Sequence, residues 1–253
     1  MKSTQTYIIV LAAIFIAGFI ACKSSSNAVG SVSVPSFSFA VHSSFLLQQW
    51  PIDQSGNKIV DSMHYVHETI VDSNVSIGGE SNVYFGIDST FDSTNTNYLF
   101  SDSIYFREYG SQVFEYDLMK NIVNTYAPGS VSGLPEKWNM LMEAGNAAGW
   151  LVDTSDFNAT ILGNPATLRD SLYGQDVKDT TMFISGDTLL VDNAQQTGTI
   201  ALTSSIYAPV VIYTYMAYNP AVVVKLVSEP TTLKGAGYNF NGIERDLISV
   251  VTK

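Results

Sequence analysis

The chain has 253 residues, of which 46% are apolar and 12% aromatic, and this composition excludes an intrinsically disordered protein. Its 12 basic and 23 acidic side chains give a formal charge of −11. That balance argues against a nucleic-acid-binding protein, because no basic field is present to neutralise phosphates. A single cysteine excludes a disulfide framework and any zinc or iron–sulfur site built from several cysteines.

The first 21 residues have the features of a cleaved export signal. Lys2 is the only charged residue before an apolar run of 15 residues, at positions 7–21. A transmembrane helix needs about 20 apolar residues to cross the hydrocarbon core, so this run is short for a permanent span. A charged start, a short apolar stretch and a small residue at its end, here Ala21, predict a signal peptide over residues 1–21.

The segment Phe19-Ile20-Ala21-Cys22 ends on the only cysteine and resembles the lipobox of bacterial lipoproteins. Ala21 and Cys22 match the family's pattern, whereas Phe19 stands where Leu is preferred. The resemblance is confined to the N-terminal segment. It implies cleavage before Cys22 and lipidation of its thiol by a diacyl group. The alternative is a free, buried cysteine that follows an ordinary export signal.

Residues 22–34 are predicted to form a lipidated, flexible tether, because they are rich in Ser and carry no apolar pattern. Two or more acyl chains make membrane attachment stable where one chain is marginal. In lipoproteins, Asp directly after the cysteine often causes retention at the inner membrane. Lys23 occupies that position here, so the resemblance implies the outer membrane. In some bacteria an acidic run after the cysteine directs a lipoprotein to the cell surface. No such run follows Cys22, so the resemblance implies the periplasmic face.

Residues 35–253 are expected to form a single β-rich domain, because apolar and polar residues mostly alternate. Alternation is clearest at residues 36–41, 82–87 and 113–118. The apolar faces of these runs are Phe37, Phe39 and Val41; Val83, Phe85 and Ile87; and Phe114, Tyr116 and Leu118. Glycine-containing turn signals separate the runs. The pattern predicts an antiparallel sheet of many short strands, curled into a half-barrel, a barrel or a sandwich, with one or two short helices.

Helix signals are few. Residues 134–148 carry Pro135 near their start and apolar residues at helical spacing, which predicts a three-turn helix. Residues 166–173 fit a short helix or a strand about equally well. Asn241-Gly242 predicts a two-residue hairpin turn, since both residue types tolerate positive φ.

The last third of the chain contains two strongly apolar runs, at residues 210–217 and 222–227, separated by the turn signal Asn219-Pro220. Strands that are apolar on both faces lie between two packed layers. The simpler interpretation is a central strand pair in the core. The functional interpretation is that one face of residues 210–217 lines a cavity for an apolar ligand.

The sequence contains no motif that assigns a catalytic, cofactor-binding or metal-ligating residue. His64 and His67 do not follow a known zinc-motif order, and a strand would place them on opposite faces. The centre of Gly129-Ser130-Val131-Ser132-Gly133 is Val rather than the nucleophilic Ser of a hydrolase. The acidic residues near turns are expected to solvate strand ends; they are Asp88, Asp92, Asp102, Asp153 and Asp156. The residues to watch for ligand contact are Trp50, Trp138 and Trp150, although each is also explained as a packing residue.

These observations predict a non-enzymatic, lipid-anchored protein of the cell envelope. One possibility is a carrier of an apolar small molecule, similar in architecture to the half-barrel carriers of lipids and lipoproteins in the periplasm. The other is a structural or assembly lipoprotein that presents a surface to an envelope protein at the outer membrane. A hydrolase is the least supported class, and no nucleic-acid partner is expected.

Overall fold

The structure, a computed structural model, describes residues 34–126, 129, 131–161 and 164–251, and the residues from Pro35 onward form one folded unit. The strands are β1 (Ser44–Ile52), β2 (His64–Ile77), β3 (Glu80–Phe91), β4 (Tyr98–Tyr109), β5 (Gln112–Tyr116), β6 (Val131–Ser132), β7 (Trp138–Glu143), β8 (Trp150–Asp153), β9 (Asp156–Ile161), β10 (Asn164–Asp176), β11 (Thr180–Ile184), β12 (Asp187–Ala201), β13 (Tyr207–Tyr218), β14 (Ala221–Ser228), β15 (Thr231–Leu233), β16 (Tyr238–Phe240) and β17 (Gly242–Val251). The helices are the 3-10 turn η1 (Val60–Ser62) and α2 (Leu118–Tyr126).

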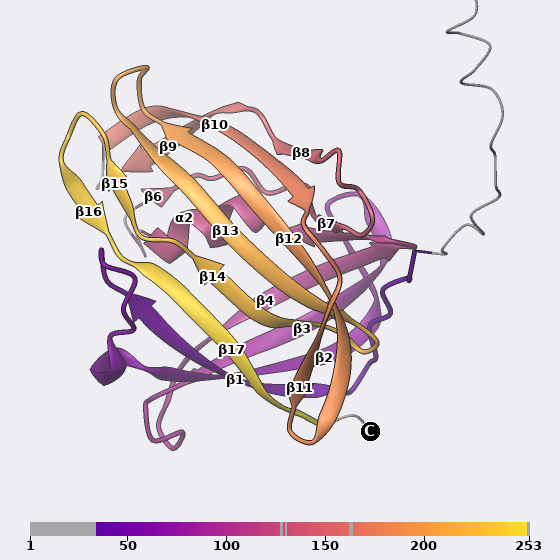
Figure 1. Ribbon diagram of the computed structural model, residues 1–253. Coiled ribbons are helices and arrows are strands. Elements are labelled where there is room, and N and C mark those ends of the chain that lie inside the picture. The colour runs from indigo at the N-terminus through magenta and orange to yellow at the C-terminus, as the bar shows by residue number, and fades with distance from the viewer. Residues whose placement is uncertain (1–33, 127–128, 130, 162–163, 252–253) are drawn as a thin grey trace, which may run out of the picture. The chain divides into compact units, whose positions relative to one another are not determined.

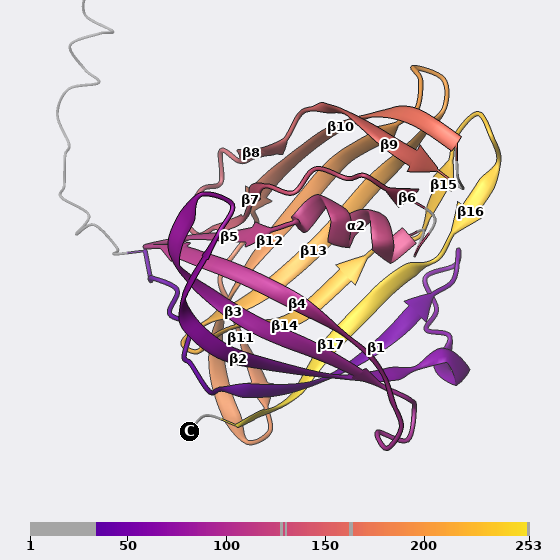
Figure 2. The ribbon, with the colours of Figure 1, turned by 180° about the vertical axis from the view of Figure 1, so that it is seen from behind.

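A single antiparallel sheet of 15 strands dominates the fold, in the order β6-β9-β10-β12-β13-β14-β17-β1-β2-β3-β4-β5-β7. β8 and β11 pair with β10 and β12 beside this path, and β15 and β16 form a separate two-stranded sheet. The large sheet curls around α2 without closing, since within the described residues its two end strands β6 and β7 are not paired with each other (Figures 1 and 2). The prediction of a mainly β, curled antiparallel sheet is confirmed.

Alternation and turn chemistry explain most of the strands. In β13 the even-numbered residues from Val210 to Met216 are buried, while the odd-numbered ones are partly exposed. Gly78 and Gly79 join β2 to β3, and both have the positive φ that a tight hairpin requires. The predicted turn at Asn219-Pro220 joins β13 to β14, and these two strands are central in the sheet as expected.

Helix α2 fills the hollow of the curled sheet. Its apolar residues Leu118, Met119, Ile122 and Val123 recur at helical spacing and are all buried. Three of them belong to the main core cluster, together with buried residues of both halves of the sheet. The concave face is therefore packed around the helix, including the inward side chains of β13.

The predicted helix at residues 134–148 is wrong, because this segment contains the strand β7. Residues Gln112–Tyr116 of β5 pair with Glu143–Trp138 of β7, so tertiary pairing decides the conformation of a segment with mixed local preferences. The helix lies earlier in the chain, at Leu118–Tyr126, whereas the alternation at residues 113–118 predicts a strand as far as Leu118. That strand, β5, ends at Tyr116, and Asp117 has a φ of 63° directly before α2. The ambiguous segment 166–173 is a strand, part of β10.

The predicted strand at residues 36–41 is also wrong, although Phe37 and Phe39 are buried as expected. Its backbone bonds to several elements in turn instead of to one strand. The Phe37 amide donates to the Gly110 carbonyl, and the Ser38 amide donates to the Tyr218 carbonyl. An extended segment with changing partners forms no ladder, so the first strand begins only at Ser44.

Asn241-Gly242 does not form the predicted hairpin turn. It separates β16 from β17, which belong to different sheets, and neither residue has positive φ. Gly242 is required for another reason. A Cβ atom at this position would lie 2.0 Å from the Ser228 carbonyl oxygen of the neighbouring strand, so only glycine fits this close approach.

Candidate functional site

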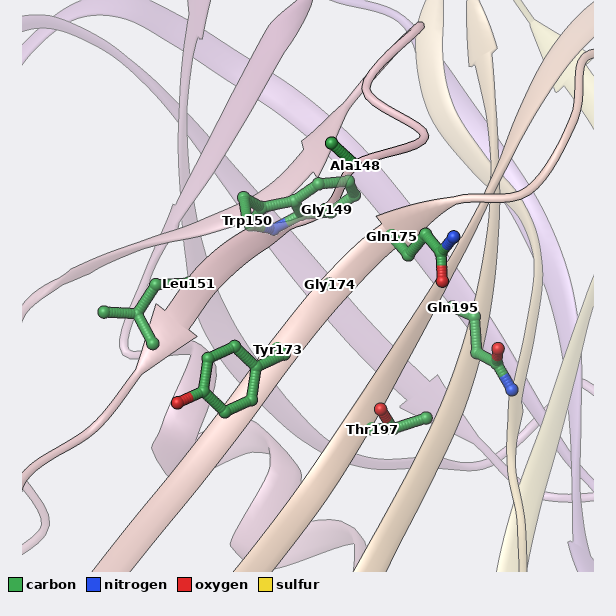
Figure 3. A pocket seen from close by; sticks show the side chains of 9 residues that line it. All are labelled: Ala148, Gly149, Trp150, Leu151, Tyr173, Gly174, Gln175, Gln195 and Thr197. Carbon is green, nitrogen blue, oxygen red and sulfur yellow. The ribbon is translucent and has the colours of Figure 1, made fainter. Parts of the chain in front are cut away.

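A pocket of about 390 Å³ lies on the outer face of the sheet, over β8, β10 and β12. We call it the outer groove, and its lining residues are Ala148, Gly149, Trp150, Leu151, Tyr173, Gly174, Gln175, Gln195 and Thr197 (Figure 3). Tyr173 and Gln175 alternate along β10 with the buried Leu172 and Gly174. Strand alternation thus directs the tyrosine ring and the amide away from the core.

The register of the sheet brings the polar residues of the groove together. Tyr173 of β10 is the partner of Thr197 of β12, and Gln175 is the partner of Gln195. On the other side of β10, Tyr173 is opposite Leu151 of β8. In Figure 3 the Tyr173 ring lies between Leu151 and the side of the groove that carries Thr197 and the two amides. The groove therefore has an apolar and aromatic end and a polar end.

The groove depends on the glycine at position 174. A Cβ atom on Gly174 would lie 2.2 Å from Cε2 of Trp150, so the indole occupies the space that a side chain would need. Trp150 is only 8% exposed, and its Nε1 donates a hydrogen bond of 3.3 Å to the Met140 carbonyl. The hydrogen bond and the burial hold the indole in place, so Trp150 forms a rigid wall of the groove and offers little exposed ring surface.

Internal hydrogen bonds orient the two amides. The Gln175 amide group donates to the Ala147 carbonyl at 2.9 Å, and because a carbonyl can only accept, the orientation of this side chain is settled. Gln195 donates to the Tyr213 hydroxyl on β13, also at 2.9 Å. The Gln175 carbonyl oxygen is then left as an acceptor, whereas the Gln195 amide, whose partner is a hydroxyl, can offer a donor or an acceptor to a ligand.

The groove is electrically neutral. None of its nine lining residues carries a charge, although the protein as a whole has a formal charge of −11. The arrangement can offer amide and hydroxyl hydrogen bonds beside an exposed aromatic ring. Its lining contains no Asp, Glu, His, Lys, Arg or Cys, and the hydroxyl and amide groups that it does contain can bind a ligand by hydrogen bonds.

A second polar cluster lies on the concave side, in the core. Arg245 donates to Asp88 at 3.1 Å and to Gln49 at 3.0 Å, and Glu68 and Glu115 interact electrostatically with both charged groups. Burial is the main cause that raises the pKa of Glu68, and the Asp88 carboxyl raises it further. Burial also raises the pKa of Asp88, against the effect of Arg245, and raises the pKa of Glu115 to about 7.

These buried carboxyl groups correct two sequence expectations. The predicted apolar face of β3, Val83, Phe85 and Ile87, is only partly inward, because Gly86, Asp88 and Thr90 are the buried residues further along. Phe85 instead stacks on Tyr105 on the outer side, with ring centroids 5.3 Å apart. Asp88 is therefore a core residue and does not solvate a strand end.

The other acidic residues divide between the two roles. Asp92 forms a turn as expected, since it accepts hydrogen bonds from the backbone amides of Thr94 and Thr96. Asp153 does not, because it is 7% exposed and accepts a hydrogen bond from Lys137 at 2.6 Å. Burial raises the pKa of its neighbour Asp170 to about 6. Asp153 and Asp170 belong to one internal hydrogen-bonded cluster, in which Ser155 accepts a hydrogen bond from Lys137 and donates one from its backbone amide to Asp170.

The structure places the candidate residues of the sequence apart from one another. Cys22 and the rest of the lipobox lie outside the described residues, as does Ser130. His64 and His67 lie on the strand β2, where the His67 ring nitrogen is 2.7 Å from Asn95 Oδ1. Among the described residues, no group of three or more His, Cys, Asp or Glu side chains is placed to hold a metal ion.

Of the three tryptophans, Trp150 alone lines the outer groove. Trp50 has the Lys58 ammonium 3.7 Å from its ring centre, and Trp138 donates from Nε1 to the Ile77 carbonyl at 3.3 Å. The two groove glutamines were not predicted. Gln195 faces outward and Gln196 is buried, and adjacent identical residues give no signal of which faces the core.

Comparisons with known proteins identify the fold. No protein-family model matches the chain, and no curated protein matches it in sequence. The crystal structure of a predicted lipoprotein from Parabacteroides distasonis is similar, with a TM-score of 0.54 and 9% identity, over 85% of this chain and 97% of that chain. The crystal structure of a predicted exported protein with a YmcC-like fold from Bacteroides fragilis is also similar, with a TM-score of 0.52 and 10% identity, over 87% of this chain and 100% of that chain. At such identities the likeness shows the fold alone. Within the described part of the chain, no helix is long and apolar enough to cross a membrane.

Proposed function

We propose that this chain is a non-enzymatic lipoprotein of the cell envelope that binds a small ligand in the outer groove. Cys22 would carry the lipid and hold the protein at the periplasmic face of the outer membrane. Two observations support the envelope location: the lipobox-like segment Phe19-Ile20-Ala21-Cys22, and a fold similar to that of a predicted lipoprotein and a predicted exported protein.

The observation that carries the binding role is the neutral outer groove. Its volume of about 390 Å³ falls in the usual range for small-molecule sites. The apolar cavity expected along residues 210–217 has less support, since Val210, Ile212 and Met216 pack in the core cluster with α2. The nine lining residues include no Asp, Glu, His, Lys or Cys, the side chains that most often carry out general acid–base catalysis, and this supports a binding protein over an enzyme.

Selective enrichment from an envelope extract tests this function. Immobilised full-length protein is incubated with a small-molecule extract of bacterial envelopes, and the retained species are identified by mass spectrometry. The Thr197→Trp variant fills the groove, and Thr188→Trp is the control, because both threonines are exposed on β12. We expect a species that the native protein and the control retain and that Thr197→Trp loses. Equal retention by all three proteins, or no retention, would contradict the proposal.

A specific feature favours an assembly role as the second candidate. Residues 98–103 of β4, which we call the β4 edge, pair with β3 on one side. Their other side has no strand partner among the described residues, because the pairing of β4 with β5 begins only at Phe106 of β4. Tyr98, Leu99 and Phe100 are 58%, 46% and 53% exposed there. A strand edge with unpaired backbone groups is a template for the addition of a strand from a partner protein.

A further inference from the structure

We propose that the ligand of the outer groove is a neutral saccharide. This inference rests on the proposed binding function and names the chemical class of the ligand. It starts from the cross-strand order of the outward side chains. Tyr173 and Thr197 form one row across β10 and β12, and Gln175, Gln195 and Tyr213 form the next row across β10, β12 and β13.

The two rows place the exposed ring of Tyr173 beside a group of polar side chains. Tyr213 lies on β13, two strand spacings from Tyr173, or about 10 Å across the sheet, and it binds Gln195 from outside the groove lining. Figure 3 shows Gln175, Gln195 and Thr197 on the side of the Tyr173 ring that faces away from Leu151. Sugar rings have the complementary pattern, with C–H groups on their faces that pack on aromatic rings and hydroxyl groups on their rims that bond to amides.

The hydrogen-bonding groups match hydroxyl groups. The carbonyl oxygen of Gln175 accepts hydrogen bonds, while the Gln195 amide and the Thr197 hydroxyl can donate or accept. A sugar hydroxyl also donates and accepts, so each of these groups finds a partner. The two amides are held beforehand by the bonds to Ala147 and to Tyr213, and this preorganisation reduces the entropy lost on binding.

The same lining disfavours other ligand classes. A charged ligand would lose its water without gaining an opposite charge, because the nine lining residues are neutral. A fatty acyl chain would cover the amides of Gln175 and Gln195 and leave their free polar atoms without a partner. Such a chain also requires an enclosed apolar cavity, whereas Tyr173 is 53% exposed on the outer face. A neutral, hydroxyl-rich ligand meets neither penalty.

The test measures binding of defined glycans to the full-length protein. A panel of neutral hexasaccharides is titrated by isothermal titration calorimetry: maltohexaose, cellohexaose, laminarihexaose and chitohexaose. Hexagalacturonate and oleate serve as the acidic and apolar comparators. We expect at least one neutral hexasaccharide to bind and both comparators to fail. Vesicles that carry a glycolipid with the same sugar show whether the ligand is recognised in free or lipid-linked form, because both present the same rings.

Variants locate the binding. Tyr173→Ala should weaken the binding of the neutral hexasaccharide by about tenfold or more. Tyr173→Phe keeps the ring and should change the affinity little. Tyr238→Ala is the control, since Tyr238 is 68% exposed on β16 outside the groove. Loss of binding in Tyr173→Phe equal to that in Tyr173→Ala would contradict stacking.

The outcomes separate this inference from the proposed function. If no neutral hexasaccharide binds but the groove retains another species that Thr197→Trp loses, the saccharide class is wrong and the binding function stands. If neither the hexasaccharides nor the extract yields a groove ligand, both proposals are wrong.

Discussion

At the residue scale, the contact between Gly174 and Trp150 shows how one missing side chain shapes the outer groove. Gly174→Ala would put a methyl group 2.2 Å from the indole, and the backbone pairing of β10 with β8 prevents an easy shift. We expect a loss of about 1–3 kcal/mol in the free energy of unfolding, the usual cost of overpacking. Urea denaturation measures it. Because Phe is smaller than Trp, adding Trp150→Phe should restore part of the stability, and an unchanged urea midpoint in Gly174→Ala alone would contradict the prediction.

The buried Glu68 predicts a pH dependence of stability. Burial raises its pKa above the ordinary 4.5, so the folded protein holds this proton over a pH range in which the unfolded chain has released it. The contribution of this group to the free energy of unfolding is fully present below the ordinary pKa of 4.5. It is lost as the pH rises from that value to the pKa of the group in the folded protein. Glu115, with a pKa of about 7, acts in the same direction. Stability should therefore fall between about pH 5 and about pH 8.

Glu68→Gln tests this dependence, because the amide mimics the protonated acid without titrating. The variant should show a flatter curve of melting temperature against pH than the native protein. Asp61→Asn, an exposed position on η1, is the matched control and should leave the slope unchanged. If the curve for Glu68→Gln ran parallel to the native curve, the pKa of this carboxyl would be the same in the folded and unfolded states, and the prediction would be wrong.

At the element scale, the β4 edge is the feature with a direct experimental consequence. Leu99→Lys places a charge on this edge, and charged side chains are the usual protection of exposed strands against pairing. If the edge docks an envelope protein, crosslinking in intact envelopes should lose that partner in Leu99→Lys. Leu190→Lys on β12 is the control, since both leucines are 46% exposed. Each change should alter stability by no more than about 0.5 kcal/mol. A crosslink pattern unaffected by Leu99→Lys would count against docking at this edge.

Element types were predictable where local chemistry and tertiary structure agree. The β2–β3 and β11–β12 hairpins follow from Gly78-Gly79 and from Ser185-Gly186, whose positive φ values leave few alternatives. Segment 134–148 was mispredicted because its helical spacing competes with pairing to β5, which only the folded chain supplies. The outer groove lay beyond sequence reasoning for a related reason. It is assembled from three strands whose register is set by long-range pairing. Of its lining residues, the sequence alone indicates only Trp150 as a candidate for ligand contact.

At the scale of the whole molecule, the lipid anchor is the prediction with the broadest consequence. Cys22→Ser removes the thiol that the lipobox resemblance assigns to acylation. We expect loss of labelling by radioactive palmitate and loss of the protein from the outer-membrane fraction, because the folded unit then has no acyl chains to hold it. Fractionation of labelled cells measures both effects. Ser24→Ala, two residues away, is the control, and palmitate labelling that persists in Cys22→Ser would refute the anchor.

The position of β17 between β14 and β1 has a consequence for how the chain reaches its folded state. This last strand joins the first strand to the later half of the sheet, so that Leu47 lies opposite Leu247. Pairings of such large sequence separation are slow to form, since the loop they close must be ordered first. During synthesis, the two halves of the sheet can be joined only after the final strand has emerged. Until then β1 and β14 each keep one unpaired edge, so the pairing of β17 is the step that joins the two halves of the sheet.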